Sequence, residues 1–93
     1  MASLFLQSPL TMSNFTKNIQ TQKGVLTFYF NRIYTVNGLK YHVSARDGRL
    51  SHYFMMGDGS EQWHFTDVTY LPGWIIELEG KLEEVINEHL KNG

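Results

Sequence analysis

The stretch VLTFYFNRIYTVNGLKYHVSA, residues 25–45, decides the fold of this chain. The part before Asn37-Gly38 is rich in β-branched and aromatic residues, which is typical of a strand. Asn-Gly between two apolar segments is the strongest short signal for a hairpin turn. After the turn, apolar and polar residues alternate, as they do in a strand with one buried face. The stretch therefore predicts an antiparallel β-hairpin.

Two further turn signals extend this hairpin toward the C-terminus. Asp47-Gly48 leads into the segment RLSHYFMM, and GDGS at residues 57–60 leads into WHFTDV. Each segment has the composition of a strand that returns beside the previous one. We expect a four-stranded antiparallel meander over about residues 25–68.

The remaining segment changes to the periodicity of a helix. In LPGWIIELEGKLEEVINEHLKNG the apolar residues fall on one stripe, and Pro72 suits a first helical turn. Gly80 costs about 0.5–1 kcal/mol relative to alanine inside a helix, so we expect a close backbone contact or a bend there. The sequence predicts an α+β fold in which the four-stranded antiparallel β-meander is followed by one C-terminal α-helix, over about residues 72–91, packed on one sheet face.

Composition limits the chain to one small globular domain. It has 93 residues, of which 42% are hydrophobic and 18% are charged, a balance typical of folded domains. Residues 1–22 are rich in Ser, Thr, Asn and Gln, and we expect a flexible or irregular N-terminal segment there, followed by a single α+β domain over residues 23–93. There is no cysteine and no apolar segment long enough for a membrane span, so we expect no membrane association and a cytoplasmic location.

Charge is divided unevenly along the chain. Residues 1–66 hold six Lys and Arg against three Asp and Glu, whereas residues 67–93 hold two against six. A basic binding face or a solvated acidic helix explains such a division.

The turns also predict which residues lie beside one another. Two-residue loops at 37–38 and 47–48 and a four-residue loop at 57–60 place four residues in one row across the strands: Ile33, His42, Tyr53 and His64. The opposite face is expected to form the core, with these residues: Tyr34, Val36, Leu39, Tyr41, Val43, Ala45, Leu50, Phe54, Met56, Trp63 and Phe65. Arg32 also points into this core unless a bulge near it rotates the side chain outward.

Few residues suit catalysis or metal binding. His42 and His64 lie a whole strand apart, roughly 9–10 Å from strand spacing alone, and zinc needs convergent ligands. Ser44 lies near His42, but no Asp or Glu is expected on that face to orient the imidazole for nucleophilic catalysis. We therefore predict no enzyme activity, no cofactor and no metal site.

The uncovered face of the predicted sheet is the candidate binding face. Its aromatic and methionine side chains are typical of protein interfaces, and covering a bare sheet face stabilises a small domain. We predict a non-catalytic interaction module that forms a homodimer or binds a small protein partner. The plain alternative is that these are ordinary solvent-side residues of a half-buried sheet. The candidate binding residues are Tyr29, Ile33, Lys40, His42, Tyr53, Met55 and His64.

Single-stranded nucleic acid is the alternative partner for the same face. The rings on which bases stack are those of Tyr29, Tyr53, His42 and His64, and the positive charges are those of Lys40, Arg46 and Arg49. The order of four antiparallel strands followed by a helix is similar to the topology of the PC4-like and Whirly-like single-stranded DNA-binding proteins. This resemblance implies nucleic-acid binding, whereas the low content of basic residues differs from most nucleic-acid binders.

Overall fold

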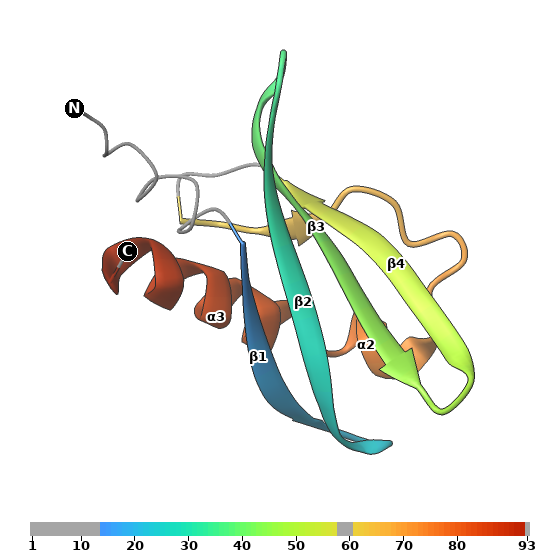
Figure 1. The fold of residues 1–93 in the computed structure, drawn as a ribbon. Coiled ribbons are helices and arrows are strands. Elements are labelled where there is room, and N and C mark those ends of the chain that lie inside the picture. Colours follow the sequence, from blue (N-terminus) through green and yellow to red (C-terminus); the bar gives the residue numbers. More distant parts are fainter. Residues whose placement is uncertain (1–13, 58–60, 93) are drawn as a thin grey trace, which may run out of the picture.

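A computed structural model of the chain describes residues 14–57 and 61–92. It shows a five-stranded antiparallel sheet in the order β1-β2-β3-β4-β5, a meander, followed by helical segments at the C-terminal end. Both helices lie on the same side of the sheet (Figure 1). The α+β fold with a C-terminal helix is thus confirmed. The elements are β1 (Asn14–Thr21), β2 (Gly24–Thr35), β3 (Gly38–Asp47), β4 (Leu50–Gly57), β5 (His64–Phe65), α2 (Gly73–Ile76) and α3 (Glu79–Asn92).

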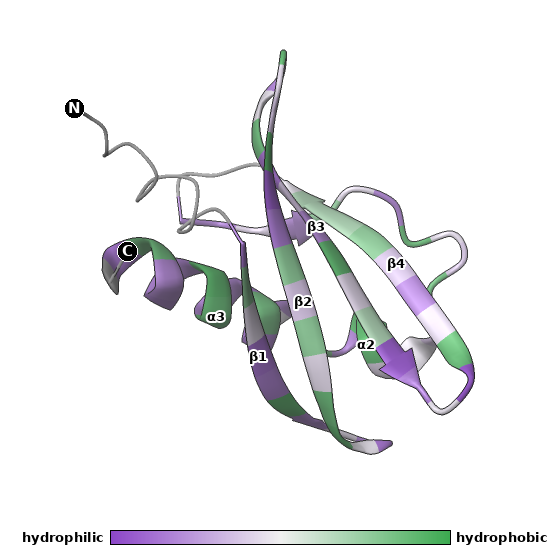
Figure 2. Ribbon diagram, in the orientation of Figure 1, coloured by the Kyte–Doolittle hydropathy of each residue, from purple (hydrophilic) through white to green (hydrophobic). Residues whose placement is uncertain are grey.

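Strand β1 is a regular edge strand where the sequence suggested a flexible or irregular segment. It pairs with β2 along its whole length, from Asn14 opposite Asn31 to Thr21 opposite Gly24. Ile19 is buried, and the Phe15 ring stacks on Phe30 with 4.5 Å between ring centroids. Most of β1 is hydrophilic (Figure 2), so its strand periodicity rests on a few side chains that face the core. The rest of the predicted segment, residues 1–13, lies outside the described residues.

The C-terminal helix is interrupted once. Residues 77 and 78 separate α2 from α3, and the Leu78 amide donates to the Ile75 carbonyl at 2.9 Å, a tighter turn than an α-helix makes. An ideal Cβ on Gly80 would meet no atom within 4 Å, so the expected close contact there is wrong. The expected bend agrees with the interruption just before Gly80.

The core lies between the sheet and the helices. Phe28, Tyr41, Val43 and Met56 from the strands are buried with several residues from 75 to 86 of the helices. Trp63 is buried at their centre, where its indole Nε1 donates to Asn87 Oδ1 at 3.1 Å. The predicted core face is therefore the one that the helices cover.

Three residues of the predicted core are instead exposed: Tyr34, Val36 and Leu50. Tyr34 and Val36 lie near the tip of the β2–β3 hairpin, which extends beyond the helices (Figure 1). The side-chain alternation is correct at this hairpin tip, but no helix or strand of residues 14–57 and 61–92 covers Tyr34 and Val36. Arg32 lies on the same side. The β2–β3 pairing is continuous through Arg32, so no bulge rotates this side chain outward. Arg32 Nη1 donates to Tyr34 Oη at 3.3 Å.

Acidic residues of α3 hold the last strand. The amides of Trp63 and Phe65 donate to Glu83 Oε2 at 2.8 Å and Glu79 Oε2 at 3.0 Å, respectively. Asn87 Nδ2 donates to the Glu61 carbonyl at 3.1 Å. These side chains supply hydrogen-bond partners to backbone groups at the β5 edge, where no further strand does so within the described residues. The acidic helix is therefore more than a solvated surface.

Candidate binding face

The hairpin turns fold differently from the prediction. Thr35 pairs with Gly38, which puts Val36 and Asn37 in the loop instead of Asn37 and Gly38. Thr35 Oγ1 accepts from the Asn37 amide at 3.1 Å and donates to the Gly38 carbonyl at 2.9 Å. Gly38 has φ of +114°, and Asn37 does not have positive φ. This matches a type I turn closed by a glycine bulge, whereas the predicted type I′ turn needs two residues with positive φ.

The other two strand pairings are also shifted, but in the opposite direction along the chain. Asp47 pairs with Leu50, so Gly48 and Arg49 form the loop; Gly48, with φ of +62°, stands first, as a type II′ turn requires. His64 pairs with Gly57 instead of Tyr53. Every shift is an even number of residues. Each side chain therefore keeps its predicted face, but its cross-strand neighbours change.

The predicted row of Ile33, His42, Tyr53 and His64 is accordingly wrong. The seven candidate residues fall instead in three rows on the side of the sheet that the helices leave uncovered, which we call the open face. The first row is Thr16, Tyr29, Ser44 and Tyr53. The second row is Asn14, Asn31, His42 and Met55. The third row is Ile33, Lys40, Gly57 and His64.

His64 turns away from the other candidate residues. Its Nδ1 lies 3.6 Å from Glu79 Oε2, the oxygen that also accepts from the Phe65 amide. The imidazole therefore lies at the edge of the sheet beside α3. We exclude His64 from the central site on this ground.

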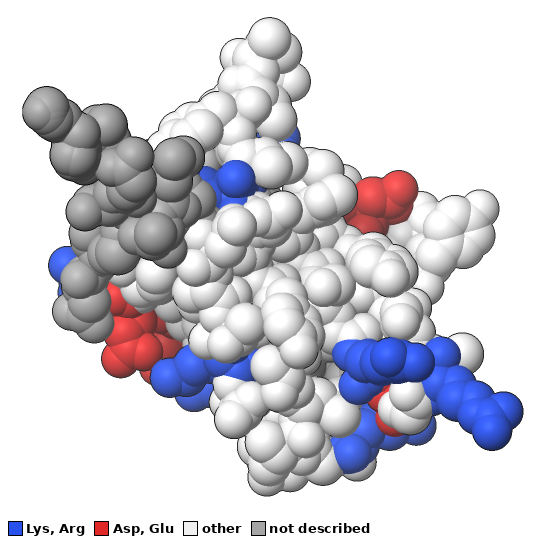
Figure 3. Space-filling view, viewed as in Figure 1, with Lys and Arg blue, Asp and Glu red and all other residues white. Residues whose placement is uncertain are grey.

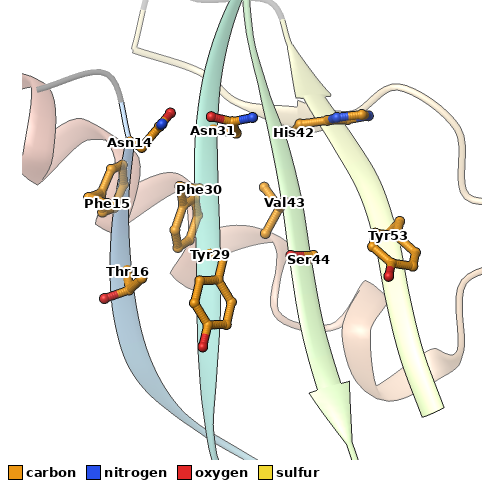
Figure 4. A pocket seen from close by; sticks show the side chains of 10 residues that line it. All are labelled: Asn14, Phe15, Thr16, Tyr29, Phe30, Asn31, His42, Val43, Ser44 and Tyr53. Atoms are coloured by element: carbon orange, nitrogen blue, oxygen red, sulfur yellow. The ribbon is translucent and has the colours of Figure 1, made fainter. Parts of the chain in front are cut away.

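A hollow of about 440 Å³ lies in the middle of the open face. Tyr29 and Tyr53, which are 56% and 72% exposed, stand on either side of the small Ser44 side chain. Asn31 and His42 line the next row (Figure 4). Because strands lie about 4.8 Å apart, the two tyrosines are roughly 10 Å apart across the sheet. The first and second rows thus form a site with aromatic sides and a polar floor.

Two positively charged side chains lie on the open face. Lys40 and Arg46 of β3 are the charged residues of β1 to β4 that alternate onto the open side. Asp67, which follows β5, lines a neighbouring hollow beside His42 and Tyr53. Figure 3 shows an uncharged middle, with Lys and Arg as well as Asp and Glu toward its periphery. An ideal Cβ on Gly57 would lie 2.9 Å from Lys40 Nζ, so the lysine extends over that glycine. Arg46 Nε donates to the Gly48 carbonyl at 3.2 Å.

Histidine, serine and carboxylate side chains are distributed over several parts of the described structure. No cluster of three or more His, Cys, Asp and Glu side chains is placed to hold an ion within residues 14–57 and 61–92. His42 and Ser44 share the open face, but the nearest histidine–carboxylate pair, His64 with Glu79, lies at the sheet edge. His52 faces the core and contacts the Trp74 ring edge to face, at 5.5 Å.

The contribution of β1 is what the sequence prediction missed. Asn14 and Thr16 line the hollow beside Tyr29. A signal for this strand is present, because Thr21-Gln22-Lys23-Gly24 repeats the pattern of Thr35-Val36-Asn37-Gly38. In both turns the threonine hydroxyl bonds to the glycine carbonyl, at 2.7 Å and 2.9 Å. A second hairpin turn of this type implies a strand before residue 21.

Comparison with known proteins adds no relative. The chain matches no model of a protein family, no curated protein and no solved structure. No helix within the described residues has the length and apolar character needed to cross a membrane. The function must therefore be argued from the open face itself.

Proposed function

We propose that this chain is a non-catalytic protein-binding module that receives a segment of another protein on its open face. The observation that carries this proposal is the row of Tyr29, Ser44 and Tyr53, in which two exposed tyrosines border the hollow. Exposed aromatic side chains beside a concave site are characteristic of binding hot spots, because they bury large apolar areas with little loss of conformational entropy.

The polar groups around the hollow also fit a polypeptide. Asn14, Asn31, Thr16 and Ser44 carry neutral amides and hydroxyls. Such groups both donate and accept hydrogen bonds, and a peptide backbone presents both donors and acceptors. This complementarity favours a protein segment as the occupant.

Single-stranded nucleic acid is the second candidate. It is favoured by Lys40 and Arg46, the charged residues of β1 to β4 that alternate onto the open side. Two cations are few for a phosphate backbone. If a single strand contacts only these two, the logarithm of its affinity should fall with the logarithm of salt concentration with a slope of about −1.4.

A peptide selection tests the proposed function. A library of random peptides is selected for binding to the wild-type protein, and the affinity of the enriched peptides is measured by fluorescence anisotropy. We expect Tyr29→Ala with Tyr53→Ala to weaken these peptides by at least about tenfold, since truncation of a hot-spot residue costs 2 kcal/mol or more.

The matched control removes two exposed apolar side chains elsewhere. Tyr34→Ala with Leu50→Ala changes residues that are 74% and 63% exposed and that lie on the opposite side of the strands from the first and second rows. This control should leave the peptide affinity unchanged. Selected peptides that bind both double variants as well as the wild type would contradict the assignment of the open face.

A further inference from the structure

The positive groups on the open face lie at unequal distances from the hollow. Lys40, Ser44 and Arg46 all lie on the open side of β3, and Ser44 forms the floor between the tyrosines. Arg46 is two residues from Ser44 in one direction and Lys40 is four residues away in the other. With a rise of about 3.4 Å per residue, these offsets correspond to about 7 Å and 14 Å along the strand.

Neither cation has an internal carboxylate partner in the part of the chain that the structure describes. The ion pairs there join Lys23 with Asp47, His64 with Glu79, and Lys81 with Glu84. Lys40 extends over Gly57, and Arg46 Nε bonds to a neutral carbonyl. Both positive charges therefore remain available to a carboxylate from a partner.

We infer that the partner segment is an extended acidic peptide with one large apolar or aromatic anchor. The anchor side chain occupies the hollow between Tyr29 and Tyr53. One carboxylate lies two residues from the anchor and meets Arg46, and another lies four residues away on the other side and meets Lys40. This inference rests on the proposed function, because it specifies the occupant of the same site.

The two cations favour a partner with negative charge, and their spacing along β3 favours an extended conformation. An extended segment above β3 has nearly the same rise per residue as the strand, so its side chains stay in step with those of Ser44, Arg46 and Lys40. A helix rises only 1.5 Å per residue and would not span the two cations with this spacing. Continuous nucleic acid is disfavoured, since the rows between Lys40 and Arg46 are neutral whereas a single-strand site follows the backbone with positive charge.

Synthetic peptides of eleven residues test this inference directly. Each has a Gly/Ser background and a single Trp as the anchor. One carries Glu two residues before and four residues after Trp, and a second has the reversed spacing, because either chain direction is allowed. Matched peptides carry Gln or Lys at the same positions, and another replaces Trp by Ala. Binding of fluorescein-labelled peptides is followed by anisotropy at low salt.

We expect the Glu peptide of one direction to bind about three- to tenfold more tightly than its Gln counterpart, the gain typical of two exposed ion pairs. The Lys peptide should bind more weakly than the Gln peptide. Lys40→Glu with Arg46→Glu should reverse this order and favour the Lys peptide. As a control with the same change of net charge, Lys81→Glu with Lys91→Glu on α3 should keep the wild-type preference.

Failure of the acidic-peptide inference and failure of the proposed function give different results. If Glu, Gln and Lys peptides bind equally and Tyr29→Ala weakens all of them, the acidic partner is wrong and the proposed binding face stands. If no Trp peptide binds better than the Ala peptide, the anchor in the hollow and the proposed function are both wrong. An unlabelled twenty-residue oligothymidine that displaces the Glu peptide at equal concentration would overturn the inference in favour of nucleic acid.

Discussion

At the scale of single residues, Tyr41 has the most unusual environment. Its side chain is fully buried beside Trp63, with 5.3 Å between the ring centroids. Burial raises the pKa of its hydroxyl above the ordinary value of 10.0, because the phenolate loses its hydration. The nearby positive charge of Arg32 opposes this effect and does not cancel it.

Alkaline pH should therefore unfold the wild-type protein more readily than Tyr41→Phe. The unfolded tyrosine ionises near pH 10, whereas the folded one still holds its proton there, so the unfolded state is stabilised as pH rises. The contribution of Tyr41 to the free energy of unfolding is complete below pH 10 and decreases above it. Urea denaturation of both proteins between pH 8 and 11 measures this difference. Parallel pH curves for the two proteins would show that Tyr41 does not differ in pKa between the states.

At the scale of elements, the contact between α3 and β5 determines how the sheet ends. The amide of Phe65 in β5 donates a hydrogen bond to Glu79, and the amide of Trp63, just before β5, donates to Glu83. A sheet edge with unpaired backbone groups invites pairing with another chain. The helix carboxylates prevent this at the β5 edge.

We expect Glu83→Ala to lower the free energy of unfolding by about 1–3 kcal/mol, because the half-buried Trp63 amide loses its acceptor. Glu83→Gln keeps an acceptor oxygen, so its free energy of unfolding should decrease less than that of Glu83→Ala. The matched control is Glu84→Ala, whose exposed pair with Lys81 at 3.1 Å is worth less than about 0.5 kcal/mol. Chemical denaturation gives the stabilities, and hydrogen exchange of the Trp63 amide should be faster in Glu83→Ala. Equal losses for the variants at 83 and 84 would count against this contact.

The faces of the strands could be predicted from the sequence, but their neighbours could not. A shift of two residues at Asn37-Gly38 leaves every side chain on its own face, so the hydrophobic alternation cannot detect the shift. The deciding group is the Thr35 hydroxyl, which holds the turn one residue earlier than the Asn-Gly signal predicts. This shift places Tyr29 opposite Ser44, and the shift at the β3–β4 turn places Tyr53 opposite Ser44, a geometry that the predicted pairing did not contain.

At the scale of the whole molecule, charge is separated between the two sides of the sheet. The open side of β1 to β4 carries Lys40 and Arg46. The helix α3, whose sequence includes Glu79, Glu83, Glu84 and Glu88, lies on the other side of the sheet (Figure 1). Two open faces brought together would place positive charge against positive charge, and such like-charge contacts suppress association. The sequence leaves open a second copy or another protein as the partner. This charge distribution favours another protein.

We therefore expect the isolated protein to be a monomer over a tenfold range of concentration, as measured by light scattering after size exclusion. Lys17 on the exposed edge strand β1 supports this expectation, since lysine on an edge strand discourages strand pairing between copies. Lys40→Glu with Arg46→Asp makes a second, informative case. Two copies of this variant would bring negative charge against negative charge, so the variant should stay monomeric. In an equimolar mixture with the wild type the open faces carry opposite charges, and association is expected only there. A wild-type dimer that Tyr53→Ala dissociates would instead identify a second copy as the occupant of the open face.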